Sequence, residues 1–204
     1  MEFLTNINII FYIIAYVVGG IPFGVLLAKK FAGVNVRESG SKSIGATNVL
    51  RVVKESNPSL AKKLSAATLI FDALKGATVL GVAMLFEVKD ATLWSIAVLA
   101  VLGHCWSPFL KFQGGKGVAT AIGLILVLAP IEGIIGLAVW AIMAKTLKIS
   151  SISSLSGVIA AVISSFFVSP DLAHAPFVLL GFIIFYKHIP NIMRLIKGDE
   201  KAVV

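Results

Sequence analysis

Long apolar runs recur along this 204-residue chain, and each has about the length of a helix that crosses a lipid bilayer. Because a helix rises about 1.5 Å per residue, about 20 apolar residues span the hydrocarbon core. Five runs are clear: Phe3–Ala28, Leu64–Phe86, Ala91–Ser107, Ile152–Val168 and Leu172–Tyr186. Hydrophobic residues make up 58% of the chain and charged residues 14%, which excludes an ordinary soluble domain. The sequence predicts one all-α integral membrane domain over residues 1–204.

A further apolar run, Val118–Leu147, is too long for one simple span. It is interrupted by Pro130, Glu132 and Gly133, and such breakers around a charge predict a hairpin of two short helices. The total is then seven transmembrane helices. With the N-terminus outside, the outer loops carry only Lys89 among the loop cations, and Glu132 lies outside. The positive-inside rule favours this arrangement, with a cytoplasmic C-terminus, over a six-helix alternative.

The formal net charge of +8 fits cation-rich cytoplasmic loops beside anionic lipid, and no nucleic-acid site is predicted. The N-terminus lacks the basic segment and cleavage site of a signal peptide, so the first span is expected to remain. The single cysteine, Cys105, has no partner for a disulfide and is expected to pack in the core.

Three polar segments interrupt the apolar runs, and the predicted topology places all three on the cytoplasmic side. They are SGSKSIGATNVLR from Ser39 to Arg51, GHCWSPFLKFQGGKG from Gly103 to Gly117, and KHIPNIMRLIKGDE from Lys187 to Glu200. Loops on a rigid scaffold commonly carry function. Their convergence on one face is the main indication of a functional site.

The first segment has the composition of an anion site. Gly40 and Gly45 permit turns in which successive N–H groups point inward, and Thr47 is expected to cap a short helix that runs through Asn48 to Arg51. A helix N-terminus beside an arginine binds anions readily. A plain solvated loop, the alternative, accounts for the glycines but not for the gathering of polar side chains.

The second segment contains Gly114, Gly115, Lys116 and Gly117, but it is not a nucleotide P-loop. Leu110 and Gly117 stand where that motif needs a glycine and a serine or threonine. What remains is a flexible cradle that presents Lys116 at the start of a helix, where its ammonium group and free N–H groups can face a phosphate. A lysine that merely reaches out to the membrane interface is the alternative.

Two histidines admit two interpretations each. His104 lies beside Trp106 near the inner end of its span, either in the site or as an interfacial histidine bonded to a backbone carbonyl. His188 and Asn191 are three residues apart on one helical face, with Pro190 bending or restarting the helix. This pair can hold substrate hydroxyls or simply cap a helix.

Asp72 and Lys75 place two charges within one span at a spacing of three residues, so they can pair on one helix face. The pair is either structural or functional. Carboxylates in the cytoplasmic segments are few, so we predict neither a metal site nor a cofactor.

Together the three segments resemble the bacterial membrane-integral acyl-phosphate:glycerol-3-phosphate acyltransferases. The similarity covers nearly the whole chain through Ser39–Arg51, Asp72–Gly76 (DALKG), Gly103–Thr120 (GHCWSPFLKFQGGKGVAT) and His188–Glu200. Lys42 and Ser43 depart from the family's usual SGNxGATN, and Pro190 replaces a usual polar residue. The resemblance implies transfer of a fatty acyl group from acyl phosphate to the sn-1 hydroxyl of glycerol 3-phosphate. The products are lysophosphatidic acid and phosphate, in the first step of phospholipid biosynthesis.

The resemblance also implies residue roles. The implied catalytic residues are Ser41, Arg51, Lys116, His188 and Asn191. The implied substrate-binding residues are Ser39, Gly40, Ser43, Gly45, Ala46, Thr47, Asn48, His104, Gly114, Gly115, Gly117 and Glu200. The Gly45–Asn48 turn would hold the acyl-phosphate headgroup, and Glu200 would help to lock the site. A monomer in the bacterial inner membrane, with its site facing the cytoplasm and only its substrates and lipid as partners, is expected.

An acyl phosphate is an activated mixed anhydride, so the enzyme needs no covalent intermediate. Cations and N–H groups must offset the repulsion between two anionic substrates and hold the attacking oxygen near the carbonyl carbon. A donor phosphate oxygen, with a second pKa of about 6, is the favoured proton acceptor, and His188 is the alternative. The rival function is a transporter of phosphorylated solutes, although transporters usually place their sites at the bilayer midplane on broken helices.

Overall fold

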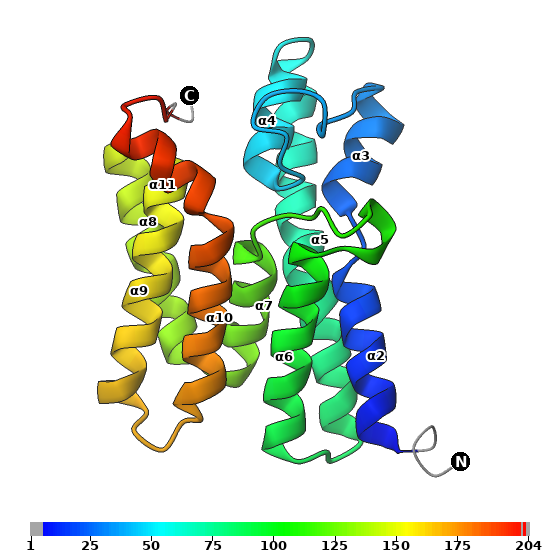
Figure 1. Ribbon diagram of the computed structural model, residues 1–204, viewed down its shortest axis with the longest axis vertical. Coiled ribbons are helices and arrows are strands. Elements are labelled where there is room, and N and C mark those ends of the chain that lie inside the picture. The colour runs from blue at the N-terminus through cyan, green and yellow to red at the C-terminus, as the bar shows by residue number, and fades with distance from the viewer. Residues whose placement is uncertain (1–5, 201, 203–204) are drawn as a thin grey trace.

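The computed structural model describes residues 6–200 and 202, and every regular element in that part of the chain is helical. In the labels of Figure 1, the first two helices are α2 (Ile7–Gly19) and α3 (Phe23–Ala32). The others are α4 (Ala46–Lys54), α5 (Pro58–Leu85), α6 (Asp90–Cys105), α7 (Val118–Leu128), α8 (Pro130–Leu147), α9 (Ser150–Val168), α10 (His174–Lys187) and α11 (Ile189–Ile196). A short 3-10 helix, Pro108–Leu110, follows α6.

Five segments of the described chain are long and apolar enough to cross a membrane: α2 with α3, α5, α6 with the 3-10 helix, α8, and α9. The pair α10 and α11 passes the same test only together and is bent by 54°. Helix α7 is apolar but has only 11 residues. The prediction of an all-helical membrane protein is confirmed. The seven crossings and the side on which each terminus lies stay predictions.

The first predicted span is broken into two helices, and its residues 3–5 lie outside the described part of the chain. Helix α2 ends at Gly19 and α3 begins at Phe23, because Pro22 has no N–H with which to continue α2. The break frees the carbonyl oxygen of Ile21, which accepts a hydrogen bond from Lys75 Nζ at 2.9 Å. Helix α5 therefore holds the break in place.

The predicted hairpin forms at Pro130, which is the first residue of α8. We expected two short helices in this hairpin, but α8 has 18 residues and α7 has 11. Glu132, which we expected in an outer loop, instead lies in the first turn of α8 with 1% of its surface exposed. The sequence placed it wrongly because a charged residue beside a proline resembles a loop, whereas Pro is favoured in the first turn of a helix.

Figure 1 shows α7 between two groups of helices, with α2, α5 and α6 on one side and α8, α9 and α10 on the other. Helix α2 packs on α6, α7 on α5, and α8 on α9. Gly136 and Gly157 permit the close approach of α8 and α9, since a Cβ at either glycine would press on the facing backbone. The three polar segments lie in the upper half of Figure 1.

Candidate active site

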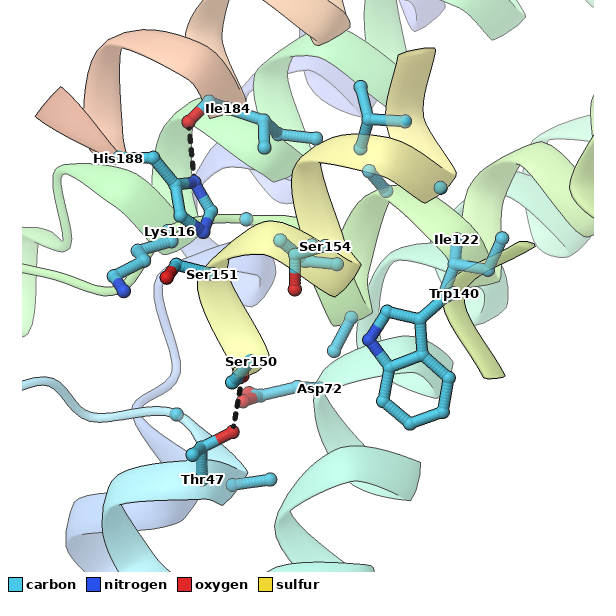
Figure 2. A pocket seen from close by; sticks show the side chains of 18 of the residues that line it. Thr47, Asp72, Lys116, Ile122, Trp140, Ser150, Ser151, Ser154, Ile184 and His188 are labelled. Carbon is cyan, nitrogen blue, oxygen red and sulfur yellow. Dashed lines mark hydrogen bonds between the residues drawn. The ribbon is translucent and has the colours of Figure 1, made fainter. Parts of the chain in front are cut away.

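A cavity of about 690 Å³ lies between the two groups of helices and receives residues from all three polar segments (Figure 2). The predicted site residues that line it are Gly40, Ser41, Ser43, Gly45, Ala46, Thr47, Asn48, Arg51, His104, Lys116, Gly117, His188, Asn191 and Glu200. Ser39, Gly114 and Gly115 do not line it. Apolar residues such as Ile122, Leu137, Trp140 and Phe177 line its other parts. The cavity is therefore amphipathic.

The first polar loop is held by one buried amide, Asn48, which is 1% exposed. Its Nδ2 donates to the carbonyl oxygens of Val36 (2.8 Å), Ser43 (2.8 Å) and Ser39 (3.2 Å). Its Oδ1 accepts from the N–H of Ser41 at 2.8 Å. An amide offers two donor hydrogens and one acceptor oxygen. All the hydrogen bonds of the Asn48 side chain are therefore made to the loop, whereas the resemblance implied that Asn48 binds substrate.

The expected cap of the short helix is wrong by two residues. Gly45 is the N-cap of α4, and no side chain caps the helix. Thr47 lies inside the first turn, and its Oγ1 lies 3.1 Å from Ser150 Oγ of α9. The first N–H groups of a helix have no partner within it, so this end of α4 offers donors to the cavity. Thr47 instead ties α4 to α9 across the cavity (Figure 2).

Lys42, one of the departures from the family pattern, adopts a left-handed backbone with φ 57°, as does Gly40 with φ 62°. Such a backbone costs an ordinary L-residue roughly 1–2 kcal/mol. Gly40 is required for a second reason, because a Cβ there would collide with Asn48 Oδ1. The loop therefore tolerates a side chain at Lys42 but not at Gly40.

The second segment packs its glycines against the end of α6. The N–H of Gly114 donates to Cys105 O at 3.2 Å, and the N–H of Gly115 donates to His104 O at 2.9 Å. Gly117, with φ 84°, turns the chain into α7. The two glycines thus support the loop from behind, and the neighbouring Lys116 reaches the cavity.

Lys116 has a strongly lowered pKa. Burial lowers its pKa from 10.5 to about 8; the nearby carboxylate of Glu200 opposes that shift, while Arg194 and Arg51 add to it. Its ammonium group is therefore poorly solvated, with one carboxylate and two guanidinium groups nearby. An anion in the cavity would offset the cost of burying this ammonium group.

The third segment bends at His188, which is 1% exposed. Its Nδ1 lies 2.8 Å from the carbonyl oxygen of Ile184. A carbonyl oxygen can only accept, so Nδ1 carries the proton and Nε2 is left as an acceptor. Figure 2 shows the ring in the part of the cavity wall that includes Lys116 and Ser151. His188 is thus oriented by a backbone carbonyl and not by a carboxylate.

Glu200 closes the cavity from the C-terminal side. Its Oε1 accepts from Ser151 Oγ at 2.8 Å and from Asn191 Nδ2 at 2.6 Å, and its Oε2 accepts from Arg194 Nε at 2.7 Å. Burial acts to raise its pKa, but the hydrogen bonds from Asn191, Ser151 and Arg194 outweigh burial and hold the pKa below its usual range. An ionised Glu200 therefore joins α9, α11 and the last described residues.

The sequence analysis missed three lining serines of α9, Ser150, Ser151 and Ser154. Ser154 is 7% exposed, and its hydroxyl makes no hydrogen bond within residues 6–200 and 202. Figure 2 shows its oxygen directed into the cavity. The sequence signal for them is the serine-rich stretch SSISSLS at the start of an otherwise apolar span. No group of three or more His, Cys, Asp or Glu side chains in the described ranges is arranged to hold a metal ion.

Comparison with known proteins gives one consistent result. The family model described as glycerol-3-phosphate acyltransferase matches residues 9–198. Proteins named glycerol-3-phosphate acyltransferase from Sulfurimonas denitrificans and Nitratiruptor sp. are 62% and 63% identical; the alignments cover all of this chain and 100% and 99% of those proteins. Crystal structures of PlsY, an integral membrane glycerol 3-phosphate acyltransferase, match in a glycerol 3-phosphate form (TM-score 0.84, 31% identity) and a lysophosphatidic acid form (TM-score 0.82, 32% identity). Each alignment covers 96% of this chain and 94% of the PlsY chain.

Proposed function

The chain belongs to the glycerol-3-phosphate acyltransferase family, and from this premise we propose that it transfers a fatty acyl group from acyl phosphate to the sn-1 hydroxyl of glycerol 3-phosphate. The products are lysophosphatidic acid and inorganic phosphate, and the reaction is the first step of phospholipid biosynthesis. The observation that carries the proposal is the amphipathic cavity, in which a cationic end continues into an apolar chamber.

The change from polar to apolar lining can be followed along α9. Ser150, Ser151 and Ser154 line the cavity at the start of the helix, and Gly157 and Val158 line it one turn later. Four helical residues advance about 6 Å. This switch supports a substrate whose charged headgroup is joined directly to a hydrocarbon chain, as in an acyl phosphate.

Two phosphate groups repel one another, so bringing the substrates together requires positive charge. Arg51 and Lys116 line the cavity from α4 and the glycine loop, and the N-terminal N–H groups of α4 open into the same space. We assign the phosphates of the two substrates to these groups, with Ser41 on the acceptor phosphate and the Gly45–Asn48 turn on the donor. Since the Asn48 side chain is engaged in the loop, we assign its part in binding to the backbone alone.

In the proposed reaction the acceptor hydroxyl oxygen attacks the carbonyl carbon of the acyl phosphate. The carbonyl oxygen gains negative charge, and the bond from carbon to the phosphate oxygen then breaks, releasing phosphate and leaving an ester. Ser154 lies at the polar end of the apolar chamber, and its hydroxyl has no hydrogen-bond partner in the described part of the chain. We therefore assign it as a donor to the carbonyl oxygen as charge develops there.

The acceptor hydroxyl also loses a proton, and we propose that an oxygen of the departing phosphate takes it. His188 then acts as an acceptor that aligns the hydroxyl through Nε2, with Asn191 beside it. Turnover of His188→Ala and His188→Gln tests this assignment. Loss of chemistry in both variants, with unchanged affinity for glycerol 3-phosphate, would instead make the histidine the general base.

The structure neighbours are integral membrane proteins, and the apolar helices make this chain a multi-pass membrane protein. We further propose that it is a single-domain monomer with seven crossings in the bacterial inner membrane, with an outer N-terminus and a cavity that opens to the cytoplasm. Site-directed labelling of single cysteines in the loops, from either side of intact cells, measures this orientation.

The decisive experiment is an activity assay on purified protein in detergent, with acyl phosphate and labelled glycerol 3-phosphate. We expect labelled lysophosphatidic acid and an equal amount of released phosphate. Acyl-CoA and acyl carrier protein serve as parallel donors and measure donor selectivity. A transporter of phosphorylated solutes would give no product without vesicles. Absence of product from acyl phosphate would refute the proposal, whether or not another donor is used.

A further inference from the structure

A buried polar cluster, two of whose members line the cavity, takes no part in the reaction steps proposed above. Asp72 and Lys75 of α5 and His104 of α6 are 2%, 5% and 3% exposed. Lys75 Nζ lies 2.9 Å from each of three atoms: Asp72 Oδ1, His104 Nδ1 and the carbonyl oxygen of Ile21. A lysine ammonium group has three N–H donors and no acceptor. Each of its hydrogens is thus matched by one acceptor.

This arrangement determines which nitrogen of His104 carries the proton. Because Lys75 can only donate, Nδ1 of His104 accepts, and a neutral imidazole then has its hydrogen on Nε2. His104 lines the cavity, and its Nε2 makes no hydrogen bond within residues 6–200 and 202. The cluster leaves one imidazole donor unused at the cavity wall.

The free donor lies beside the glycine loop. A Cβ at Gly115 would collide with His104 Nε2, so only glycine lets the loop approach the ring this closely. The same residues are joined through the backbone, since the N–H of Gly115 donates to His104 O at 2.9 Å. The next residue along the loop is Lys116, whose side chain lines the cavity. His104 and Lys116 thus line the same cavity, and the backbone that carries Lys116 is packed on the imidazole ring.

We propose that Asp72 and Lys75 are positioning residues, which hold His104 as a neutral donor whose Nε2–H binds a phosphate oxygen beside Lys116. The inference rests on the proposed function and deepens it. A lysine alone would leave an unpaired cation in a membrane span, so Asp72 supplies the compensating charge at 2.9 Å. Lys75 in turn fixes the imidazole, much as a second partner orients a metal-bound histidine.

Two amide substitutions of His104 separate a substrate contact from a structural one. His104→Gln places an amide donor near the position of Nε2 but gives up the contact with Lys75, whereas His104→Asn keeps an acceptor for Lys75 and gives up the donor. We expect KM for a phosphate-bearing substrate to rise at least tenfold more in His104→Asn than in His104→Gln. The reverse order would show that His104 serves only to satisfy Lys75, and would overturn the inference.

The positioning role is tested by removing both charges together. Replacing a buried ion pair by apolar residues of similar size often leaves stability unchanged. We expect the double variant Asp72→Val/Lys75→Met to unfold close to the parent's temperature and yet to show KM raised about tenfold, the lower end of the effect of orienting partners. A folded double variant with the parent's KM would mean that the pair is purely structural.

Thr68→Val is the matched control, since Thr68 lies one turn earlier on α5, is fully buried, donates to Leu64 O and does not line the cavity. It should keep the parent's KM. Separate KM values for glycerol 3-phosphate and for acyl phosphate show which phosphate the imidazole contacts. If the parent makes no product, the proposed function fails; if the parent is active and both KM values are unchanged in every His104 variant, only the inference fails.

Discussion

Replacing Asn48 tests whether the first polar loop depends on a single buried amide. The two N–H hydrogens of the side chain are shared among three carbonyl oxygens, its oxygen accepts a fourth contact, and the residue is 1% exposed. At a net value of roughly 1 kcal/mol each, Asn48→Ala removes up to about 4 kcal/mol from the ordered loop. At about 1.4 kcal/mol per factor of ten, the ratio of ordered to disordered loop falls by as much as roughly 10³-fold. We expect kcat/KM to fall by 10²-fold to 10³-fold on that scale.

Asn48→Asp sharpens the test because it changes hydrogen bonding with almost no change in shape. The carboxylate keeps an acceptor for the N–H of Ser41 but brings negative charge against the carbonyl oxygens of Val36 and Ser43. We expect it to be at least as inactive as Asn48→Ala. Asn57→Ala is the control, since Asn57 caps α5 through one exposed bond to Leu60 N and should leave kcat/KM unchanged.

The assay is lysophosphatidic acid formation by detergent-purified variants, combined with amide hydrogen exchange over residues 36–48. Faster exchange in this segment should accompany the loss of activity, while the transmembrane helices keep their protection. Retention of kcat/KM within threefold in Asn48→Ala, or an Asn48→Asp variant more active than Asn48→Ala, would refute the reasoning. Either result would mean that the loop is ordered by contacts other than this amide.

Three further outcomes follow from the cavity. Because the pKa of Lys116 is about 8, its charge is present below that pH and lost above it, so kcat/KM should fall about tenfold per pH unit above pH 8. The variant Lys116→Arg should keep its activity to above pH 10. Ser154→Ala should lower kcat by about 10²-fold with KM for glycerol 3-phosphate unchanged. The hydroxyl of Ser153 donates to Ile149 O, so the control Ser153→Ala should match the parent. Equal kcat in the two variants would refute the contact between Ser154 and the carbonyl oxygen. Gly181→Leu fills the apolar chamber, since a Cβ at Gly181 meets only ordinary contacts. It should lower relative kcat/KM for long acyl donors by about fourfold for each displaced CH₂. An unchanged dependence of kcat/KM on chain length would place the acyl chain elsewhere.

Several features of the site were predictable because they depend on local chemistry. Gly40 and Gly117 adopt the left-handed backbone that glycine favours, and Pro190 lies in the first turn of a restarted helix. Other features were not, because they depend on partners distant in sequence. Ser154 became a candidate only through the packing of α9 along the cavity, and the hydrogen bonds of the Asn48 side chain to the first polar loop depend on how that loop folds back on α4.

By itself the sequence determined that this is an all-helical membrane protein, because apolar runs of bilayer length and satisfied helical hydrogen bonds leave a chain little choice in lipid. It also determined which segments would be polar. Only the tertiary structure decided which segments meet. Helix α4 meets α9 through Thr47 and Ser150, and the break after α2 meets α5 through Lys75. The physical reason is that a hydrogen bond between distant segments depends on where packing places its two atoms, and no local pattern records that position.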